Sequence, residues 1–107
     1  MNAALHALAD PTRRAILARL AEGEATVGEL AKPFAISQPA VSQHLKVLEA
    51  AGLIERRIDG TRRPCRLSPE GLAQIEAWLA QLRKTFESNY SRLDDLLDEM
   101  QAQEEQP

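Results

Sequence analysis

The chain has 107 residues, 44% of them hydrophobic, which is enough for one domain with a single core and too few for two. It has neither a basic N-terminal segment followed by an apolar run nor about 18 consecutive apolar residues, so we expect no signal peptide and no membrane span. Its net charge is −3, and its one cysteine excludes an internal disulfide, so a reducing cytoplasm is the expected compartment.

The charged residues are distributed unevenly along the chain. Residues 37–66 contain six basic and three acidic side chains, whereas residues 87–107 contain one basic and seven acidic ones. Duplex DNA attracts proteins mainly through Lys and Arg contacts to phosphate. The overall negative charge therefore does not exclude a DNA-binding surface, provided that the basic segment forms it.

The N-terminal segment predicts two helices. Residues 2–8 are rich in Ala and Leu and predict one or two helical turns. Asp10 can then cap a second helix, with Pro11 at its first position, where the missing N–H costs nothing. Gly23 is expected to end this helix.

Two further short helices follow with a tight connection between them. Residues 26–29 have the form of a capping box, and Pro33 keeps the helix that follows it short. A second start signal opens a helix over residues 37–51, which Gly52 closes. This arrangement predicts a helix-turn-helix, with residues 37–51 as the recognition helix.

The recognition helix has two different faces when it is drawn at about 100° per residue. Val41, Leu45 and Leu48 form the face expected to be buried, with His44 at its margin. There a packed histidine with one nitrogen bonded to backbone or phosphate is favoured over a titrating switch or ligand. The opposite face carries short or amide side chains and one lysine, which suit base edges and phosphate better than they suit inert helix surface. We predict DNA contacts for Ser37, Gln38, Pro39, Ser42, Gln43, His44 and Lys46.

A β-hairpin is predicted over residues 53–67, where two strand-like runs flank the Asp-Gly pair at residues 59–60. A type I′ turn at this pair would place Ile54 opposite Cys65. Charge on such a ribbon can serve only to block edge-to-edge aggregation, but four arginines exceed that need. We predict that they contact a minor groove or a phosphate row. They are Arg56, Arg57, Arg62 and Arg63.

Cys65 is expected to point into the core from the hairpin. A small buried hydrophobe is the favoured interpretation, because apolar surroundings raise the pKa of a thiol and lower its reactivity. The nearby Arg63 and Arg66 leave a reactive, redox-sensing thiol as the alternative.

A long helix is predicted over residues 69–103, with apolar side chains recurring about every 3.5 residues as in a coiled coil. At 1.5 Å per residue it would be about 50 Å long. Its distal half therefore needs a partner surface, for which a second copy of the chain is the simplest candidate. Trp78 lies off the seam and is expected to pack against the N-terminal helix of either subunit. The predicted dimer contacts are Leu5, Leu8, Trp78, Leu79, Leu82, Phe86, Tyr90, Leu93 and Leu97.

No catalytic motif is recognisable in the sequence. It contains no paired nucleophile and base, phosphate-binding loop, carboxylate dyad or metal-ligating cluster. We therefore predict that the chain is not an enzyme and that it has neither a cofactor nor a metal site.

Several segments closely resemble the ArsR/SmtB family of bacterial repressors, and the resemblance covers nearly the whole chain up to about residue 82. The matching segments are ADPTRRAIL at residues 9–17, EL at 29–30, SQPAVSQHLKVL at 37–48 and AGLIERR at 51–57. The resemblance implies a homodimer held by its first and last helices. It also implies that two recognition helices enter successive major grooves of a palindromic operator, with the hairpins alongside.

The sequence differs from the metal-sensing members of this family in two places. Those members carry a box of the form ELCVCDL before the recognition helix, whereas this chain has ELAKPF at residues 29–34. Metal sites at the dimer interface use histidines and carboxylates of the last helix, and this chain has no histidine after His44. The comparison with the family therefore implies a metal-independent repressor.

These observations predict one winged helix-turn-helix domain over residues 1–107, mainly α, with a β-hairpin wing and a C-terminal dimerisation helix. The predicted function is sequence-specific regulation of transcription by a cytoplasmic homodimer that binds duplex DNA. Two alternatives remain. The winged helix could instead bind another protein, which would leave the arginines unused, or the chain could be a redox-responsive regulator acting through Cys65.

Overall fold

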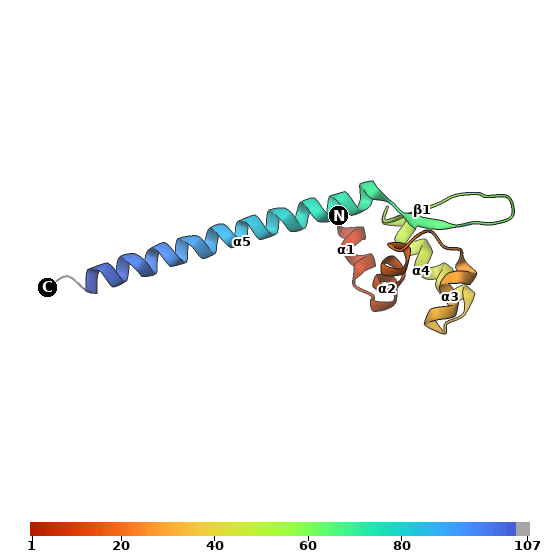
Figure 1. The fold of residues 1–107 in the computed structure, drawn as a ribbon, viewed down its shortest axis with the longest axis horizontal. Coiled ribbons are helices and arrows are strands. Elements are labelled where there is room, and N and C mark those ends of the chain that lie inside the picture. The colour runs from red at the N-terminus through yellow and green to blue at the C-terminus, as the bar shows by residue number, and fades with distance from the viewer. Residues whose placement is uncertain (105–107) are drawn as a thin grey trace. The chain divides into compact units, whose positions relative to one another are not determined.

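A computed structural model describes residues 1–104 (Figure 1). It confirms a mainly helical fold with a two-stranded hairpin and a long C-terminal helix. The chain forms two compact units, Met1–Ile75 and a second one that begins at Glu76. The elements are α1 (Asn2–Leu8), α2 (Pro11–Leu20), α3 (Val27–Phe34), α4 (Gln38–Ala50), β1 (Ile54–Arg56), β2 (Cys65–Leu67) and α5 (Pro69–Glu104).

Each of the three internal helices begins at a side chain that caps it. Asp10 accepts a hydrogen bond from the backbone N–H of Arg13 at 2.9 Å, which lowers the pKa of its carboxyl group. Thr26 and Glu29 form a reciprocal capping box at the start of α3, and Ser37 caps α4. These contacts satisfy backbone N–H groups that a helix start leaves unpaired, so the sequence signals for the three starts are confirmed.

The connection between α3 and α4 contains a left-handed residue. Ala35 ends α3 with a φ of 53°, although it is not a glycine. Pro33 lies inside the last turn of α3 and does not prevent that turn from forming. The tight reversal lets α3 and α4 pack against each other, as a helix-turn-helix requires.

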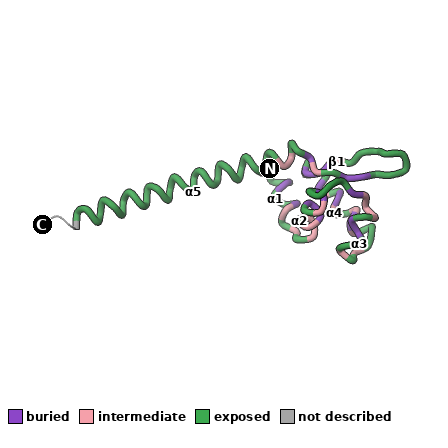
Figure 2. Tube along the Cα trace, viewed as in Figure 1, coloured by how far each residue is buried: buried purple, intermediate pink, exposed green. Residues whose placement is uncertain are grey.

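The core lies in the first unit and is built from one face of each short helix and from the hairpin (Figure 2). Leu30, Leu45 and Leu48 are completely buried, as are Pro64 and Cys65 in the hairpin. The predicted burial of Cys65 is confirmed, and burial raises the pKa of its thiol. The favoured interpretation of this residue as a small buried hydrophobe is therefore the better one.

The hairpin register predicted from the sequence was wrong. The structure pairs Ile54 with Leu67 and not with Cys65, a shift of two residues. An isolated bridge between Asp59 and Arg62 leaves Gly60 and Thr61 at the centre of the turn. The turn therefore centres one residue later than predicted, and its first central residue, Gly60, has a φ of 63°, which glycine adopts at little steric cost.

The first turn of α5 makes a close backbone contact that requires glycine. A Cβ atom added to Gly71 would lie 1.9 Å from the carbonyl oxygen of Gly52 and 2.9 Å from its carbon. Both atoms belong to backbone, so neither can move away cheaply.

Replacing Gly71 with Ala is therefore expected to destabilise the protein by about 1–3 kcal/mol, the usual cost of overpacking. Urea denaturation followed by circular dichroism, at one fixed protein concentration, measures the change. Gly28→Ala is the matched control, because its nearest neighbour would be a side-chain atom at 3.7 Å and alanine favours a helix. Equal stability of Gly71→Ala and the unmodified protein would refute the expectation.

Residues 76–103 of α5 are all exposed (Figure 2). The large hydrophobic residues Phe86, Leu93 and Met100, seven positions apart, are each at least half exposed. Within residues 1–104, no helix combines the length and the hydropathy needed to cross a membrane.

Candidate nucleic-acid interface

Helix α4 has the two faces that the sequence predicts. Val41, Leu45 and Leu48 have an exposed fraction of 0% and hold the helix against the core. Gln43 and Lys46 are exposed on the other side of the helix. The amide of Gln43 has both donors and acceptors for a base edge, and the ammonium of Lys46 suits phosphate or guanine.

The predicted contact residues at the start of α4 are also accessible. Gln38 and Pro39 are exposed, and Ser42 is half-buried. The hydroxyl oxygen of Ser37 accepts a hydrogen bond from the backbone N–H of Ala40 at 3.2 Å. Its proton remains available to an acceptor on DNA, so capping and a phosphate contact are compatible.

His44 lies beside a carboxylate of another helix. Its Nδ1 is 4.0 Å from Oδ2 of Asp10, the N-cap residue of α2, and its side chain is about one quarter exposed (25%). This position matches the interpretation of His44 as a histidine packed at the core edge. A DNA contact of His44 stays a prediction.

The hairpin arginines are mostly paired with carboxylates of the same chain. Arg57 donates to both carboxylate oxygens of Glu24, and Arg62 donates to Oε1 of Glu29 at 3.0 Å. Arg56 lies 3.6 Å from a carboxylate oxygen of Glu49, its partner in α4. These pairs place three of the four predicted DNA-contacting arginines in contact with acidic groups.

Arg63 differs from the other three predicted arginines. Its Nη1 donates to the carbonyl oxygens of Gly60 and Arg62, both at 2.9 Å. Among the residues that the structure describes, it forms no ion pair with a carboxylate. Arg63 thus keeps an uncompensated positive charge at the tip of the hairpin.

The carboxylates that pair with the hairpin are held in their charged form. The side-chain hydrogen bond from Arg57 lowers the pKa of Glu24, and the same bond raises the pKa of Arg57. Hydrogen bonds from the hydroxyl and backbone N–H of Thr26, followed by Arg62, lower the pKa of Glu29. Both carboxylates are therefore charged at neutral pH.

Sequence reasoning did not identify Glu24 or Glu29 as part of this surface. Each lies 33 residues from its arginine partner. A backbone bridge between Ala25 and Cys65, with N···O distances of 2.8 and 3.0 Å, brings the segment before α3 alongside the hairpin. No pattern of neighbouring residues in the sequence indicates these ion pairs.

The seam of α5 is a second exposed surface. All the predicted dimer contacts on this helix are exposed, and Leu96 and Met100 are further exposed hydrophobic residues close to them. On α1, Leu5 is exposed and Leu8 is half-buried against the core.

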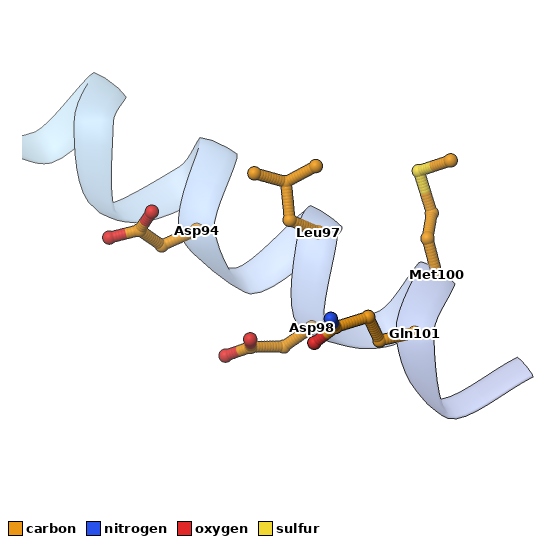
Figure 3. A pocket seen from close by; sticks show the side chains of 5 residues that line it. All are labelled: Asp94, Leu97, Asp98, Met100 and Gln101. Carbon is orange, nitrogen blue, oxygen red and sulfur yellow. The ribbon is translucent and has the colours of Figure 1, made fainter. Parts of the chain in front are cut away.

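The distal end of α5 separates apolar from acidic side chains. Figure 3 shows Leu97 and Met100 pointing to one side of the helix, and Asp94 and Asp98 to another. A surface hollow here is lined by residues of this one helix alone, which does not make an enclosed ligand site.

Comparisons with known proteins agree with this arrangement. A helix-turn-helix domain model matches residues 8–57. The HTH-type transcriptional regulator Rv2034 of Mycobacterium tuberculosis is 50% identical to this chain over 92 residues, which cover 86% of both proteins.

Solved structures show the same similarity. The crystal structure of an ArsR family transcriptional regulator is 45% identical, with a TM-score of 0.72, over 80% of this chain and 94% of that one. The solution structure of a homodimeric winged helix-turn-helix DNA-binding domain from Mycobacterium bovis is 31% identical. Its TM-score is 0.65, over 78% of this chain and 77% of that one.

The fold and these similarities define a winged helix-turn-helix transcriptional regulator, a class of DNA-binding proteins that are not enzymes. The chain belongs to the ArsR family. The prediction that it is not an enzyme is thereby confirmed.

Proposed function

We propose that this chain is a metal-independent repressor that binds a palindromic operator in duplex DNA as a homodimer. The observation that carries the proposal is the division of α4 into one completely buried face and one accessible face. The accessible face carries Ser42, Gln43 and Lys46, whose side chains suit base edges and phosphate. An exposed arginine at the tip of the hairpin extends this basic character.

The homodimer is proposed from the exposed seam of α5. Leu79, Phe86 and Leu93 are seven positions apart, and each is about half exposed or more (49%, 65% and 51%). A contiguous apolar stripe of this length is unfavourable in water and marks an interaction surface. A second copy supplies an identical stripe, and the similar domain from Mycobacterium bovis is described as homodimeric.

Repression follows from occupancy of a promoter by such a dimer. Two recognition helices related by a two-fold axis would read half-sites about 10 base pairs apart, so the operator is expected to be palindromic. The dimer would then cover the promoter DNA that RNA polymerase needs. This proposal keeps the predicted contacts of α4, together with the hairpin, as the surface that meets DNA.

Metal independence is proposed from the donor set that the chain offers. Helix α3 carries Ala31 and Pro33 where the sequence pattern of metal sensors has cysteines, and Cys65 is buried in the core. Among the described residues, no three His, Cys, Asp or Glu side chains gather in a way that could hold a metal ion. The residues present therefore do not fit the metal sites of this family.

DNA binding by the protein is accordingly expected to be unchanged by Zn²⁺ or by EDTA. Fluorescence anisotropy with one operator duplex, at fixed ionic strength, measures the dissociation constant under each condition. The expected ratio of the two constants is about one, because binding of metal to the free protein and to the complex would not differ. A tenfold or larger change with Zn²⁺ would contradict metal independence and leave DNA binding itself intact.

The function is tested by selecting duplexes from a random library with the purified protein. The selected duplex should bind at least about 1000-fold more tightly than a scrambled duplex of equal length at the same salt concentration. A footprint of this duplex should show two symmetric half-sites. Equal affinity for the selected and scrambled duplexes would refute sequence-specific regulation.

A further inference from the structure

The hairpin beyond its strands has two different faces. Asp59 and Arg62 exchange backbone hydrogen bonds of 3.1 and 2.9 Å, and the N–H of Arg57 donates to the carbonyl of Pro64 at 3.0 Å. Between these two hydrogen-bonded pairs, Ile58 lies opposite Arg63. In an antiparallel ladder the side chains of such a pair point to the same face and lie close together.

One face of the hairpin is tied by ion pairs to the segment around the start of α3. Arg57 pairs with Glu24, and Arg62 pairs with Glu29, both on the segment that leads into and begins α3. Because side chains alternate along a strand, Arg57 and Arg62 belong to the same face. This face points toward acidic groups, and its positive charge is compensated before DNA arrives.

Ile58 and Arg63 share the other face, which carries the buried Ile54 and Cys65 within the strands but is accessible at Ile58, near the tip of the hairpin. Ile58 is 75% exposed, more than any other exposed large hydrophobic residue of the described chain. Two backbone carbonyls hold Nη1 of Arg63, which leaves its Nε and Nη2 available. The pair combines a branched apolar side chain with an uncompensated cation.

We propose, on the basis of the DNA-binding function proposed above, that Ile58 and Arg63 form the contact of the hairpin with the minor groove. Arg63 is attracted by the negative potential of the groove, and Ile58 packs against the sugar walls beside it. The amino group at N2 of guanine projects into this groove, so Ile58 favours A·T pairs under the hairpin.

Arg57 and Arg62 have a different role under this proposal. Their ion pairs with Glu24 and Glu29 fix the hairpin at the angle that presents Ile58 and Arg63, so they are positioning residues. A positioning arginine that keeps its carboxylate partner releases few counterions from DNA. Removing an arginine that contacts DNA lowers the slope of the logarithm of the binding constant against the logarithm of the salt concentration by about one.

The first experiment uses the duplex selected from the random library and measures its dissociation constant at several salt concentrations. Ile58→Ala is expected to weaken binding by about tenfold, because it removes three carbon atoms from an apolar contact. Ile58→Val, which keeps the branched side chain, is the matched control and should bind nearly as the unmodified protein does. Arg63→Ala should reduce the salt slope by about one, whereas Arg57→Gln should weaken binding and leave the slope unchanged.

The groove is identified by changing the base pair under the hairpin. Replacing an A·T pair there with G·C should weaken binding of the unmodified protein, and replacing that G·C with inosine·C should restore it, because inosine lacks the N2 amino group. Ile58→Ala should respond much less to both changes. An equal response of both proteins would overturn the role given to Ile58.

A charge exchange tests the role of Arg57. Arg57→Glu alone is expected to weaken binding, and the double variant Glu24→Arg, Arg57→Glu should recover most of the affinity, because it restores the ion pair in reverse. A direct phosphate contact by Arg57 would leave the double variant as weak as the single one, and this result would overturn the positioning role.

The measurements distinguish a failure of the proposed DNA-binding function from a failure of the proposed hairpin contact. If the unmodified protein does not distinguish the selected duplex from a scrambled one, the proposed function and this inference both fall. If it binds specifically while Ile58→Ala and Arg63→Ala bind as the unmodified protein does, only this inference is overturned. Thermal melting of each variant, with an unchanged midpoint expected for the exposed Ile58, confirms that the fold is intact.

Discussion

Replacing Gln43 with Ala should weaken binding of the selected operator by about 5- to 150-fold, equivalent to roughly 1–3 kcal/mol. Gln43 is exposed on α4, opposite the face that Leu45 and Leu48 bury in the core. A glutamine amide can bond to an adenine edge through a donor and an acceptor at once. The loss should be specific for the operator, and binding to a scrambled duplex should change little.

The recognition helix offers a second substitution with a different signature. Lys46→Ala removes an exposed cation, so it should weaken binding to specific and scrambled duplexes alike if Lys46 contacts phosphate. It should also reduce the salt slope by about one. Anisotropy titrations at three or more salt concentrations separate this behaviour from that of Gln43→Ala.

Gln74→Ala is the matched control for Gln43→Ala, because Gln74 is an exposed glutamine of α5 outside the recognition helix. Its affinity for the operator should equal that of the unmodified protein. If Gln43→Ala binds as tightly as Gln74→Ala, the accessible face of α4 does not read bases. The assignment of the recognition helix would then be wrong.

The double variant Phe86→Asp, Leu93→Asp should raise the dissociation constant of the homodimer by at least about 100-fold. The two positions are seven residues apart on the exposed seam of α5, so they face the same partner surface. Burying two unpaired carboxylates between apolar helices costs several kcal/mol. The ring of Tyr90, whose centroid lies 5.9 Å from that of Phe86 at an interplanar angle of 32°, would also lose its neighbour.

A variant that cannot form the dimer should also bind the operator much more weakly. One recognition helix contacts one half-site, so a monomer loses the contribution of the second half-site. Analytical ultracentrifugation gives the oligomeric state, and anisotropy gives the affinity for the full operator and for a single half-site. We expect the double variant to bind both duplexes with the same low affinity.

Ser88→Asp combined with Ser91→Asp provides the control, since it adds the same charge to α5 outside the seam. This control should remain dimeric and bind the operator, which separates disruption of the seam from electrostatic repulsion of DNA. A double seam variant that stays dimeric at micromolar concentration would place the dimer interface elsewhere. A monomer that binds the full operator normally would refute the two-fold model of recognition.

Local sequence rules were sufficient for the helix-turn-helix and for the two faces of α4. Capping by Asp10, Thr26 and Ser37 acts within three residues along the chain, so these helix starts are visible without a fold. The burial of Val41 and Leu48 follows from helical periodicity, which also acts over a few residues. The DNA contacts of α4 are predicted from these same local features.

The hairpin shows where local rules stopped being sufficient. The Asp-Gly pair predicted a turn correctly but not its centre, because Gly60 satisfies the need for a positive φ equally well at either central position. The choice depends on the whole ladder, in which Ile54 pairs with Leu67. Burial of Ile54 and Cys65 does not select between the two registers, because a shift of two residues leaves both side chains on the same face.

By itself, the sequence determined the helix starts, the buried face of the recognition helix, the apolar seam of α5 and the resemblance to a repressor family. Only the tertiary structure decided that Arg57 and Arg62 meet Glu24 and Glu29, and that Gly71 lies against the backbone of Gly52. The physical reason is distance along the chain. Helix caps and periodicity operate over a few residues, whereas these contacts join segments that only the packing of the core brings together.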